Sequence, residues 1–485
     1  MGWKGRMGGT GRMGRNRIAA LILVVLAAPV FGAGDANEAA TARKLAAIRN
    51  QPLALEVFLR EMPKGGDLHN HLSGAIYAES YLRWAVDDKL CIVVATFTIA
   101  AAPCDANAGR PPASTVVDDA MLYNQAIDAM SMRNWPTNLN GHDHFFQAFG
   151  RFGVVSAARV GDMIAEVSAR AAAEHVSYLE LMVTPDGGVA SRLGRQAGWT
   201  SDFAQMRAKL LSSGWADVLA QSKQRLDRFE ARRRDVLKCG TSAPEAGCLV
   251  TLRYIAQVGR ATPPEEVFAQ ILAGFEIATS EPRVVGINLV QPEDAPIAVR
   301  DFMLHMNMID FLHQLYPKVH VSLHAGEISN GLVPPDVLRF HIRESVRKGH
   351  AERIGHGAAA MQEDDPYGLI RELAAKKILV EINLTSNDMI LGVRGARHPL
   401  RTYLQYGVPI AISTDDYGVA RSSHTLEWLK AVQEHNLDYL TMKRMVRNSI
   451  EYAFVDAQTK AQLKQSLENA FHQFEQQQTA AAPRR

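Results

Sequence analysis

The stretch Val321-Ser322-Leu323-His324-Ala325-Gly326-Glu327 decides the fold. It closes an apolar, β-branched run, 319–323, with a histidine, and Ala-Gly then turns the backbone just before a carboxylate. The run predicts a buried parallel strand, and the turn predicts that the chain leaves the strand at this point. A metal ligand and an acid are therefore expected at one strand end, although His-Ala-Gly-Glu alone is a weak signal.

Three other segments, each following a short apolar run, also carry chemically active side chains. They are Asp67-Leu68-His69-Asn70-His71, Arg353-Ile354-Gly355-His356-Gly357 and Ile412-Ser413-Thr414-Asp415-Asp416. Because side chains alternate along a strand, His69 and His71 should share a face, where two imidazoles can hold one ion. Each motif alone is also compatible with ordinary core packing, but the four together indicate a metal site.

Short apolar runs recur along the chain, and helical patterns separate most of them. The runs are 178–183, 250–255, 284–290, 319–323, 353–355, 378–382 and 408–413, and the short strand expected at 67–71 brings the number of strands to eight. Eight alternating β and α units predict an α/β protein with a parallel (β/α)8 barrel of the TIM type. Catalytic groups of such barrels follow the carboxyl ends of the strands, which is where all four motifs fall.

The chain is predicted to have four parts. Residues 1–33 form a signal peptide, 34–64 a helical leader, 65–455 the barrel with an insertion at about 88–117 after the first strand, and 456–485 a C-terminal helix and tail. The first part places five basic residues before an apolar run, 18–30, that is too short to cross a bilayer. This pattern predicts export to the periplasm or the medium, with cleavage near Ala33 and no stable membrane anchor.

The composition is that of a folded protein, with 47% hydrophobic and 21% charged residues. Loss of the five basic residues of the signal peptide would change the formal net charge from +2 to −3. Nothing in this balance indicates a nucleic-acid partner, and Arg232-Arg233-Arg234 is predicted to be a solvated face.

The four cysteines form two pairs that are close in sequence. In an exported protein we expect the local disulfides Cys91–Cys104 and Cys239–Cys248, among three connectivities that the four residues allow. Four unpaired, buried thiols are the alternative. Neither pair has the Cys-x-x-Cys spacing of a zinc ribbon.

His69, His71, His324 and Asp415 supply three imidazoles and one carboxylate, a donor set suited to a catalytic zinc ion. Such an ion would lower the pKa of its water toward neutrality. Segment 286–291 has no lysine where binuclear barrel hydrolases carry a modified one, which favours one ion per chain.

Three further residues are predicted to act on the substrate or the water. Glu327, three residues beyond a ligand, is placed as a proton donor. His356 could orient or deprotonate the water, and Asp416 could bind a nitrogen of the substrate.

These residues resemble the adenosine deaminase family, within the metal-dependent amidohydrolases. The matching pieces are Leu68-His69-Asn70-His71-Leu72, His324-Ala325-Gly326-Glu327, Arg353-Ile354-Gly355-His356-Gly357, Ser413-Thr414-Asp415-Asp416 and Asn448-Ser449-Ile450-Glu451-Tyr452-Ala453-Phe454. The exported character, the leader and the cysteine-bounded insertion look closest in layout to the secreted, growth-factor-related branch. There the leader and insertion serve dimerisation and surface binding, so a homodimer is one expectation.

The resemblance implies zinc ligation by the four residues named above. It also implies that Glu327 protonates adenine N1, His356 positions the attacking water and Asp416 bonds purine N7. The implied reaction is zinc-dependent deamination of adenosine, and of 2′-deoxyadenosine, to inosine and ammonia, by attack of metal-bound hydroxide at purine C6.

Two departures from the family leave the substrate open. Ser73 stands where the family often has Asp near the ribose 5′-hydroxyl, and Gln291-Pro292 stands where a glycine commonly meets purine N3. Ser73 and Gln291 are therefore candidate specificity residues. The alternatives are deamination of another purine or a modified adenosine, hydrolysis of a cyclic amide, and an inactive, growth-factor-like binding protein.

Overall fold

Eight parallel strands form a closed barrel in the computed structural model, which describes residues 1–2, 33–136 and 139–480. The barrel strands are β1 (Gly65–His71), β4 (Val176–Val183), β5 (Thr251–Gly259), β6 (Val284–Val290), β7 (His320–Ala325), β8 (Arg353–His356), β9 (Leu379–Ile382) and β10 (Ile410–Ile412). Each strand pairs with the next one along the chain, and a parallel bridge between Asn70 and Asp415 closes the ring. The predicted (β/α)8 fold is confirmed.

The barrel strands are buried on both faces, which is why their sequences are nearly continuous apolar runs. In β7, for example, Val321 and Leu323 point to one face and are fully buried. Ser322, between them, points to the other face and is buried as well. The register of β7 and β8 sets Ala325 opposite His356. The ends of these two strands are therefore level, and the residues that follow them meet.

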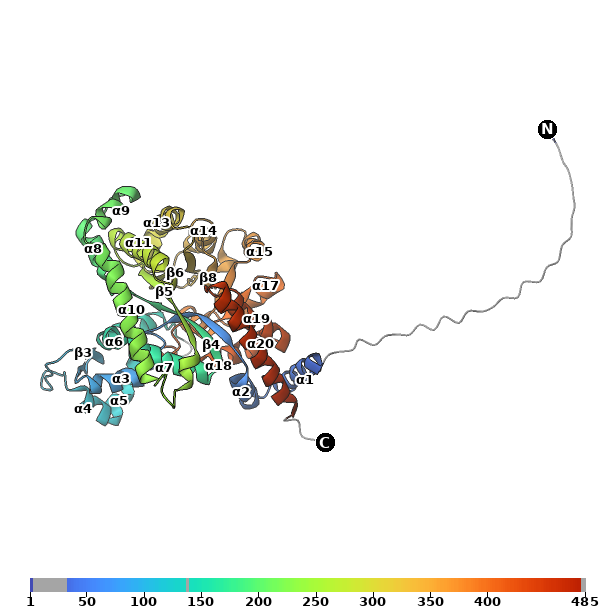
Figure 1. Cartoon of the computed structure of the whole chain (residues 1–485), viewed down its shortest axis with the longest axis horizontal. Helices are drawn as coiled ribbons and strands as arrows, with labels where there is room; N and C mark the ends of the chain where they lie inside the picture. The colour runs from blue at the N-terminus through green and yellow to red at the C-terminus, as the bar shows by residue number, and fades with distance from the viewer. Residues whose placement is uncertain (3–32, 137–138, 481–485) are drawn as a thin grey trace.

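Helices surround the barrel (Figure 1). Those from β4 to the last strand are α8 (Val189–Ala197), α9 (Phe203–Leu211), α10 (Ala216–Val236), α11 (Pro264–Ser280), α12 (Pro296–Arg300), α13 (Phe302–Leu315), α14 (His341–Arg347), α15 (Pro366–Lys376), α16 (Leu384–Leu391) and α17 (Leu400–Gln405), followed after β10 by α18 (His424–His435) and α19 (Tyr439–Glu451). Helix α11 shows why they form: Pro264 and two acidic residues begin it, which suits the positive end of the helix dipole.

Helices from both ends of the described chain pack together at one side of the barrel (Figure 1). They are α1 (Ala33–Ile48), α2 (Pro52–Glu61) and the last helix, α20 (Ala457–Ala480). The Nζ atom of Lys443 on α19 lies 2.6 Å from carboxylates of both Glu38 on α1 and Glu475 on α20. Apart from residues 1, 2 and 33, the predicted signal peptide lies outside the described residues. Among the residues that the structure describes, none of the helices combines the length and the apolar character of a membrane span.

The segment after β1 forms a small lobe beside the barrel. Helix α3 (Ala78–Asp87) leads to an antiparallel pair, β2 (Cys91–Val93) and β3 (Thr98–Ala100), and α4 (Ala113–Asp118) and α5 (Ala120–Ala129) follow. A disulfide joins Cys91 to Cys104 within this lobe. Helices α6 (His142–Ala158) and α7 (Val160–Ala173) then return the chain to β4.

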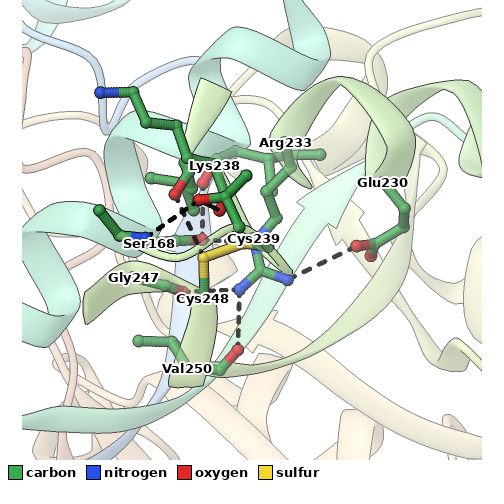
Figure 2. Close-up of a disulfide and its surroundings, with 12 residues drawn as sticks. Ser168, Glu230, Arg233, Lys238, Cys239, Gly247, Cys248 and Val250 are labelled. Atoms are coloured by element: carbon green, nitrogen blue, oxygen red, sulfur yellow. Dashed lines mark hydrogen bonds and ion pairs between the residues drawn. A yellow bond between two sulfur atoms is a disulfide. The ribbon is translucent and has the colours of Figure 1, made fainter. Parts of the chain in front are cut away.

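The second disulfide, Cys239–Cys248, closes a loop over the end of α10 (Figure 2). Arg233 lies beneath this loop and is only 8% exposed. Its Nη2 atom donates to the carbonyls of Gly247 and Val250, at 2.8 and 2.9 Å. The prediction of a solvated arginine face was therefore wrong for this residue, because the loop supplies carbonyl acceptors that replace water. Its neighbours in the triplet are exposed.

Candidate active site

The four predicted metal ligands lie together at the carboxyl ends of β1, β7 and β10. The Nε2 atom of His324 lies 3.0 Å from the Nε2 atoms of both His69 and His71. The Oδ1 atom of Asp415 lies 3.5 and 3.4 Å from those same two atoms. Separations of about 3 Å are those expected between donors that surround one ion at about 2 Å.

Two side chains fix the orientation of the ligand imidazoles. The Oε2 atom of Glu381 accepts a hydrogen bond from Nδ1 of His69 at 2.7 Å. The Oδ1 atom of Asn288 accepts from Nδ1 of His324 at 2.8 Å and also from the backbone N–H of His324 at 2.9 Å. With Nδ1 committed as a donor in both rings, Nε2 is the atom that each ring presents to the centre.

This donor set fits a divalent metal ion. The side chains of His69, His324, His356 and Asp415 bring their ligand atoms within 4.8 Å of one another, and the side chains of His71, Asp415 and Asp416 do the same. Burial opposes protonation of His69, but hydrogen bonds to Asp415 and Glu381 raise its pKa to about 10. A metal ion would displace that proton, since imidazole ligates only when Nε2 is free.

Glu327 lies in the turn just after β7 and is almost fully buried. Gly326 makes the turn possible with φ of +78°. The carboxylate of Glu293 accepts from the backbone N–H groups of Gly326 and Glu327, at 3.1 and 2.8 Å, and so holds the turn in place. Burial, and after it the charge of Asp415, raise the pKa of Glu327 well above its usual value. Both effects favour the neutral, protonated form of Glu327.

A hydrogen-bonded chain sets the tautomer of His356 at the end of β8. The backbone N–H of Leu400 donates to Nδ1 of His398 at 3.1 Å, so Nε2 of His398 carries a proton. That Nε2 donates to Oδ1 of Asn387 at 3.1 Å, and Nδ2 of Asn387 donates to Nδ1 of His356 at 2.8 Å. Nε2 of neutral His356 is consequently protonated. This atom is buried, has no hydrogen-bond partner among the described residues, and faces Glu327 and Asp415 at 3.6 and 3.8 Å.

Asp416 lies against the loop that follows the two ligands of β1. A Cβ atom on Gly74 would lie 1.6 Å from Oδ1 of Asp416, so only glycine leaves room for this carboxyl group. The Oδ1 atom is buried and unpartnered among the described residues. Burial, and then the charges of Asp415 and Glu327, raise the pKa of Asp416 well above its usual value. Asp416 can thus donate a hydrogen bond.

A cavity of about 440 Å³ opens onto these groups. Ser73 and Gln291, predicted to bind substrate, both line it, together with Phe145, Phe146 and Phe149 of α6. Phe152, the fourth aromatic residue of that helix, belongs to the core. The four cysteines are not among the lining residues. The predicted metal ligands His71, His324 and Asp415, the acid Glu327 and the predicted substrate residues therefore line one hollow. His69 and His356 are fully buried and do not line it.

One ion pair joins the two walls of the cavity. Nε2 of His142, at the start of α6, lies 2.9 Å from Oδ1 of Asp294, which follows Gln291 and Pro292 of the opposite wall. Nδ1 of His142 lies 2.8 Å from Oδ1 of Asp143. Because both ring nitrogens meet carboxylates, the imidazolium form is favoured. Burial opposes it, yet the bonds to Asp294 and Asp143 raise the pKa of His142.

We expect this pair to make KM depend on pH. The charge of His142 is complete below the ordinary histidine pKa and is lost as pH rises through the raised pKa, so KM should increase over that upper range. Asp294→Asn should raise KM about fivefold at pH 6, as for an ion pair of about 1 kcal/mol, and should remove the increase. Steady-state kinetics from pH 6 to 9 measures both. Asp143→Asn is the matched control, because that carboxylate is 88% exposed; an unchanged KM in Asp294→Asn would reject the role.

The sequence did not identify the residues that hold the metal ligands, the acid and His356 in position. Glu381 and Asn288 had a visible signal, since each is a lone polar residue inside an apolar strand. Glu293 and Asn387 carry no such sequence signal, because their partners are distant in sequence or lie in loops whose conformation the sequence does not predict.

Comparisons with known proteins agree with this geometry. Residues 135–470 match the model of the family described as adenosine deaminase. Adenosine deaminase of Escherichia coli (strain SE11) is 33% identical over 149 residues, which are 30% of this chain and 41% of that protein. The chain thus aligns with about two fifths of the length of the curated relatives that it matches.

Solved structures extend the likeness to nearly the whole fold. A zinc-bound amidohydrolase from Burkholderia ambifaria has a TM-score of 0.58 at 19% identity, covering 88% of this chain and 94% of that one. An Arabidopsis N6-mAMP deaminase has a TM-score of 0.54 at 19% identity, covering 85% and 99%. An adenine deaminase from Arthrobacter aurescens has a TM-score of 0.53 at 18% identity, covering 84% and 98%. At these identities the structures show a shared fold.

Proposed function

Because the chain belongs to the adenosine deaminase family, we propose that it is a zinc-dependent deaminase that converts adenosine, and 2′-deoxyadenosine, to inosine or deoxyinosine and ammonia. One observation carries the proposal. Three imidazoles and a carboxylate converge at one point, and two buried carboxyl groups with raised pKa, Glu327 and Asp416, face the same cavity. No single residue among these is specific, but together they match the needs of hydrolysis at an amidine carbon.

We propose His69, His71, His324 and Asp415 as the residues that hold the ion. When bound, zinc would supply the Lewis-acid chemistry that makes a water molecule nucleophilic near neutral pH. The absence of lysine from segment 286–291 supports a single ion, and Asn288 in this segment is engaged with His324.

Glu327 would supply the proton that the purine ring takes up. As water adds to C6, the electron pair of the N1=C6 bond moves to N1, and the protonated Glu327 carboxyl can deliver its proton there. The raised pKa of Glu327 fits this task, since an ordinary glutamate would have no proton to give near neutral pH. Glu327 is the proposed general acid.

His356 is placed to orient the attacking water through its protonated Nε2. The hydrogen bond from Asn387 engages Nδ1, so Nε2–H can donate to the water oxygen and stabilise negative charge on it. Of the two roles that the sequence allowed, orientation and deprotonation, the tautomer supports orientation. Asp416, which keeps a proton, can donate to purine N7 and fix the ring at the same end of the cavity.

A four-substrate panel tests the proposal. We expect the adenine absorbance band to be lost with adenosine and 2′-deoxyadenosine, with release of one ammonia per nucleoside, and much less with AMP or adenine. Chelation should abolish turnover and zinc should restore it. Faster turnover of AMP or adenine would reassign the substrate, and no turnover of any adenine compound by zinc-loaded protein would reject the activity.

We also propose that the protein is exported. Five basic residues before a short apolar run support this, and the two disulfides suit an oxidising compartment. Cell fractionation and N-terminal sequencing of the mature protein test it: a cytoplasmic protein that retains residues 1–33 would reject export.

A further inference from the structure

A second hollow adjoins the catalytic cavity. Its volume is about 360 Å³, and it shares Ser73, Thr184 and Gln257 with the first cavity. Nε2 of Gln257 donates to Oγ1 of Thr184 at 2.9 Å. Because the same three residues line both hollows, no more than one layer of side chains separates them.

The second hollow contains none of the proposed catalytic or metal-binding side chains. Its walls are mixed: apolar side chains such as those of Leu72, Met163 and Phe229 lie beside polar ones such as those of Ser156, Thr184 and Gln257. Arg225 of α10 is its one cationic lining residue among those described. The hollow therefore offers apolar contacts on part of its wall and carries a positive charge at one place.

Arg225 is positioned but not paired with a carboxylate in the described part of the chain. Its guanidinium lies against Gly187, where a Cβ atom would approach Cζ to 2.7 Å, and it lies 5.3 Å from the ring centre of Phe229. Its Nε atom is buried without a hydrogen-bond partner. The nearest opposing charge is Asp186, whose two oxygens already accept from the backbone N–H groups of Gly188 and Ala190, at 3.3 and 2.7 Å.

The orientation of the substrate links the two hollows. Glu327, His356 and Asp416 would hold the reacting ring at the metal end of the cavity. The sugar must then extend toward lining residues away from that end, and Ser73, Thr184 and Gln257 form the boundary on one side. A substituent on the sugar that moves these side chains apart would reach the second hollow.

We propose that the preferred substrates are adenine nucleosides whose sugar carries a short apolar spacer ending in an anion, with the anion paired to Arg225. This inference rests on the proposed function and extends it to a substrate class. The apolar side chains of the wall, among them Leu72, Met163 and Phe229, favour a spacer of methylene or thioether type. A guanidinium favours a carboxylate or phosphate at the end of that spacer.

An isosteric substrate pair tests the proposal. The 5′-O-succinyl and 5′-O-butyryl esters of adenosine differ chiefly in a terminal carboxylate in place of a methyl group. We expect kcat/KM to be at least about tenfold higher for the succinyl ester, the effect of one charge-assisted hydrogen bond. Arg225→Gln should reduce this ratio to near one and leave adenosine turnover unchanged. A ratio near one in the wild type, or a ratio that survives in Arg225→Gln, would overturn the proposal.

Two further variants separate charge from space. Arg228→Gln is the matched control, because it removes the same charge from an exposed site one turn along α10 and should keep the ratio. Ala157→Trp narrows the second hollow from the exposed end of α6 and should slow both esters but not adenosine. If both esters keep their rates in Ala157→Trp, substituents do not enter this hollow and the proposal fails.

These assays also distinguish a carboxylate from a phosphate as the bound anion, and they separate failure of this inference from failure of the proposed function. An Arg225-dependent preference for AMP over the succinyl ester would assign the anion site to phosphate and overturn the spacer. Adenosine turnover with no preference for the succinyl ester rejects only this inference. Calorimetric binding of 5′-O-succinylinosine against 5′-O-butyrylinosine repeats the comparison without turnover, so the inference is tested even if adenosine is not a substrate.

Discussion

Replacement of Glu327 by glutamine is expected to lower kcat about 1,000-fold, within the range for loss of a general acid. Glutamine keeps the size of the side chain and can still donate a hydrogen bond to N1, but it cannot transfer a proton. Because Glu327 is not one of the residues proposed to hold the ion, metal content should stay at one ion per chain. Steady-state assays with adenosine, combined with metal analysis, measure both quantities.

The matched control is Glu363→Gln. Glu363 is another buried glutamate, 4% exposed, and its pKa is also raised, to about 7, by burial. Its carboxylate accepts from the backbone N–H of Arg343 and does not line the cavity, so kcat should change by less than about threefold. Wild-type turnover in Glu327→Gln would reject the role of acid, and loss of the metal would show that the substitution acts on the ion instead.

The strands could be predicted because barrel strands are buried on both faces and leave a sequence signal of unusual clarity. The residues at their ends followed from topology: once the strands are parallel and closed, His69, His324 and Asp415 must meet, although 346 residues separate the first from the last. Strand limits were less certain. Strand β1 begins at Gly65, two residues before the polar motif from which the strand was predicted. This start was not predicted because a glycine with positive φ carries no hydrophobic signal.

The supporting residues could not be predicted, because their roles depend on distances between segments that the sequence does not contain. Arg233 and its neighbours Arg232 and Arg234 are alike in sequence, and only the loop folded over α10 makes one of them buried. Asn387 lies in α16 and its amide reaches His356 from a different unit of the barrel. Such residues can be identified only from the hydrogen bonds that they make in the folded structure.

Glu381 begins a buried chain of charges that runs from the site to the end of the barrel. Its Oε1 atom forms an ion pair with Nε of Arg353 at 2.7 Å, and Nη2 of Arg353 donates to Oε2 of Glu180 at 2.5 Å. The other oxygen of Glu180 accepts from the backbone N–H of Phe454 at 2.8 Å, and the Phe454 ring lies 3.7 Å from the guanidinium carbon of Arg353. Through Phe454, the Asn448–Phe454 segment is therefore linked to His69 by buried contacts.

Glu381→Gln should weaken metal binding about 10- to 100-fold, the usual cost of losing a partner that orients a metal-ligating histidine. The neutral amide can still accept from Nδ1 of His69 but no longer stabilises positive charge on the ring, and it leaves Arg353 without one of its two carboxylates. A chelator competition measures the affinity, and kcat of the fully loaded variant should fall much less than the affinity. Glu427→Gln is the matched control, since Glu427 is equally buried and bonds Thr385 and Ser422 instead of a histidine. Equal metal affinity in the two variants would mean that Glu381 serves folding alone and that His69 needs no oriented carboxylate to hold the ion.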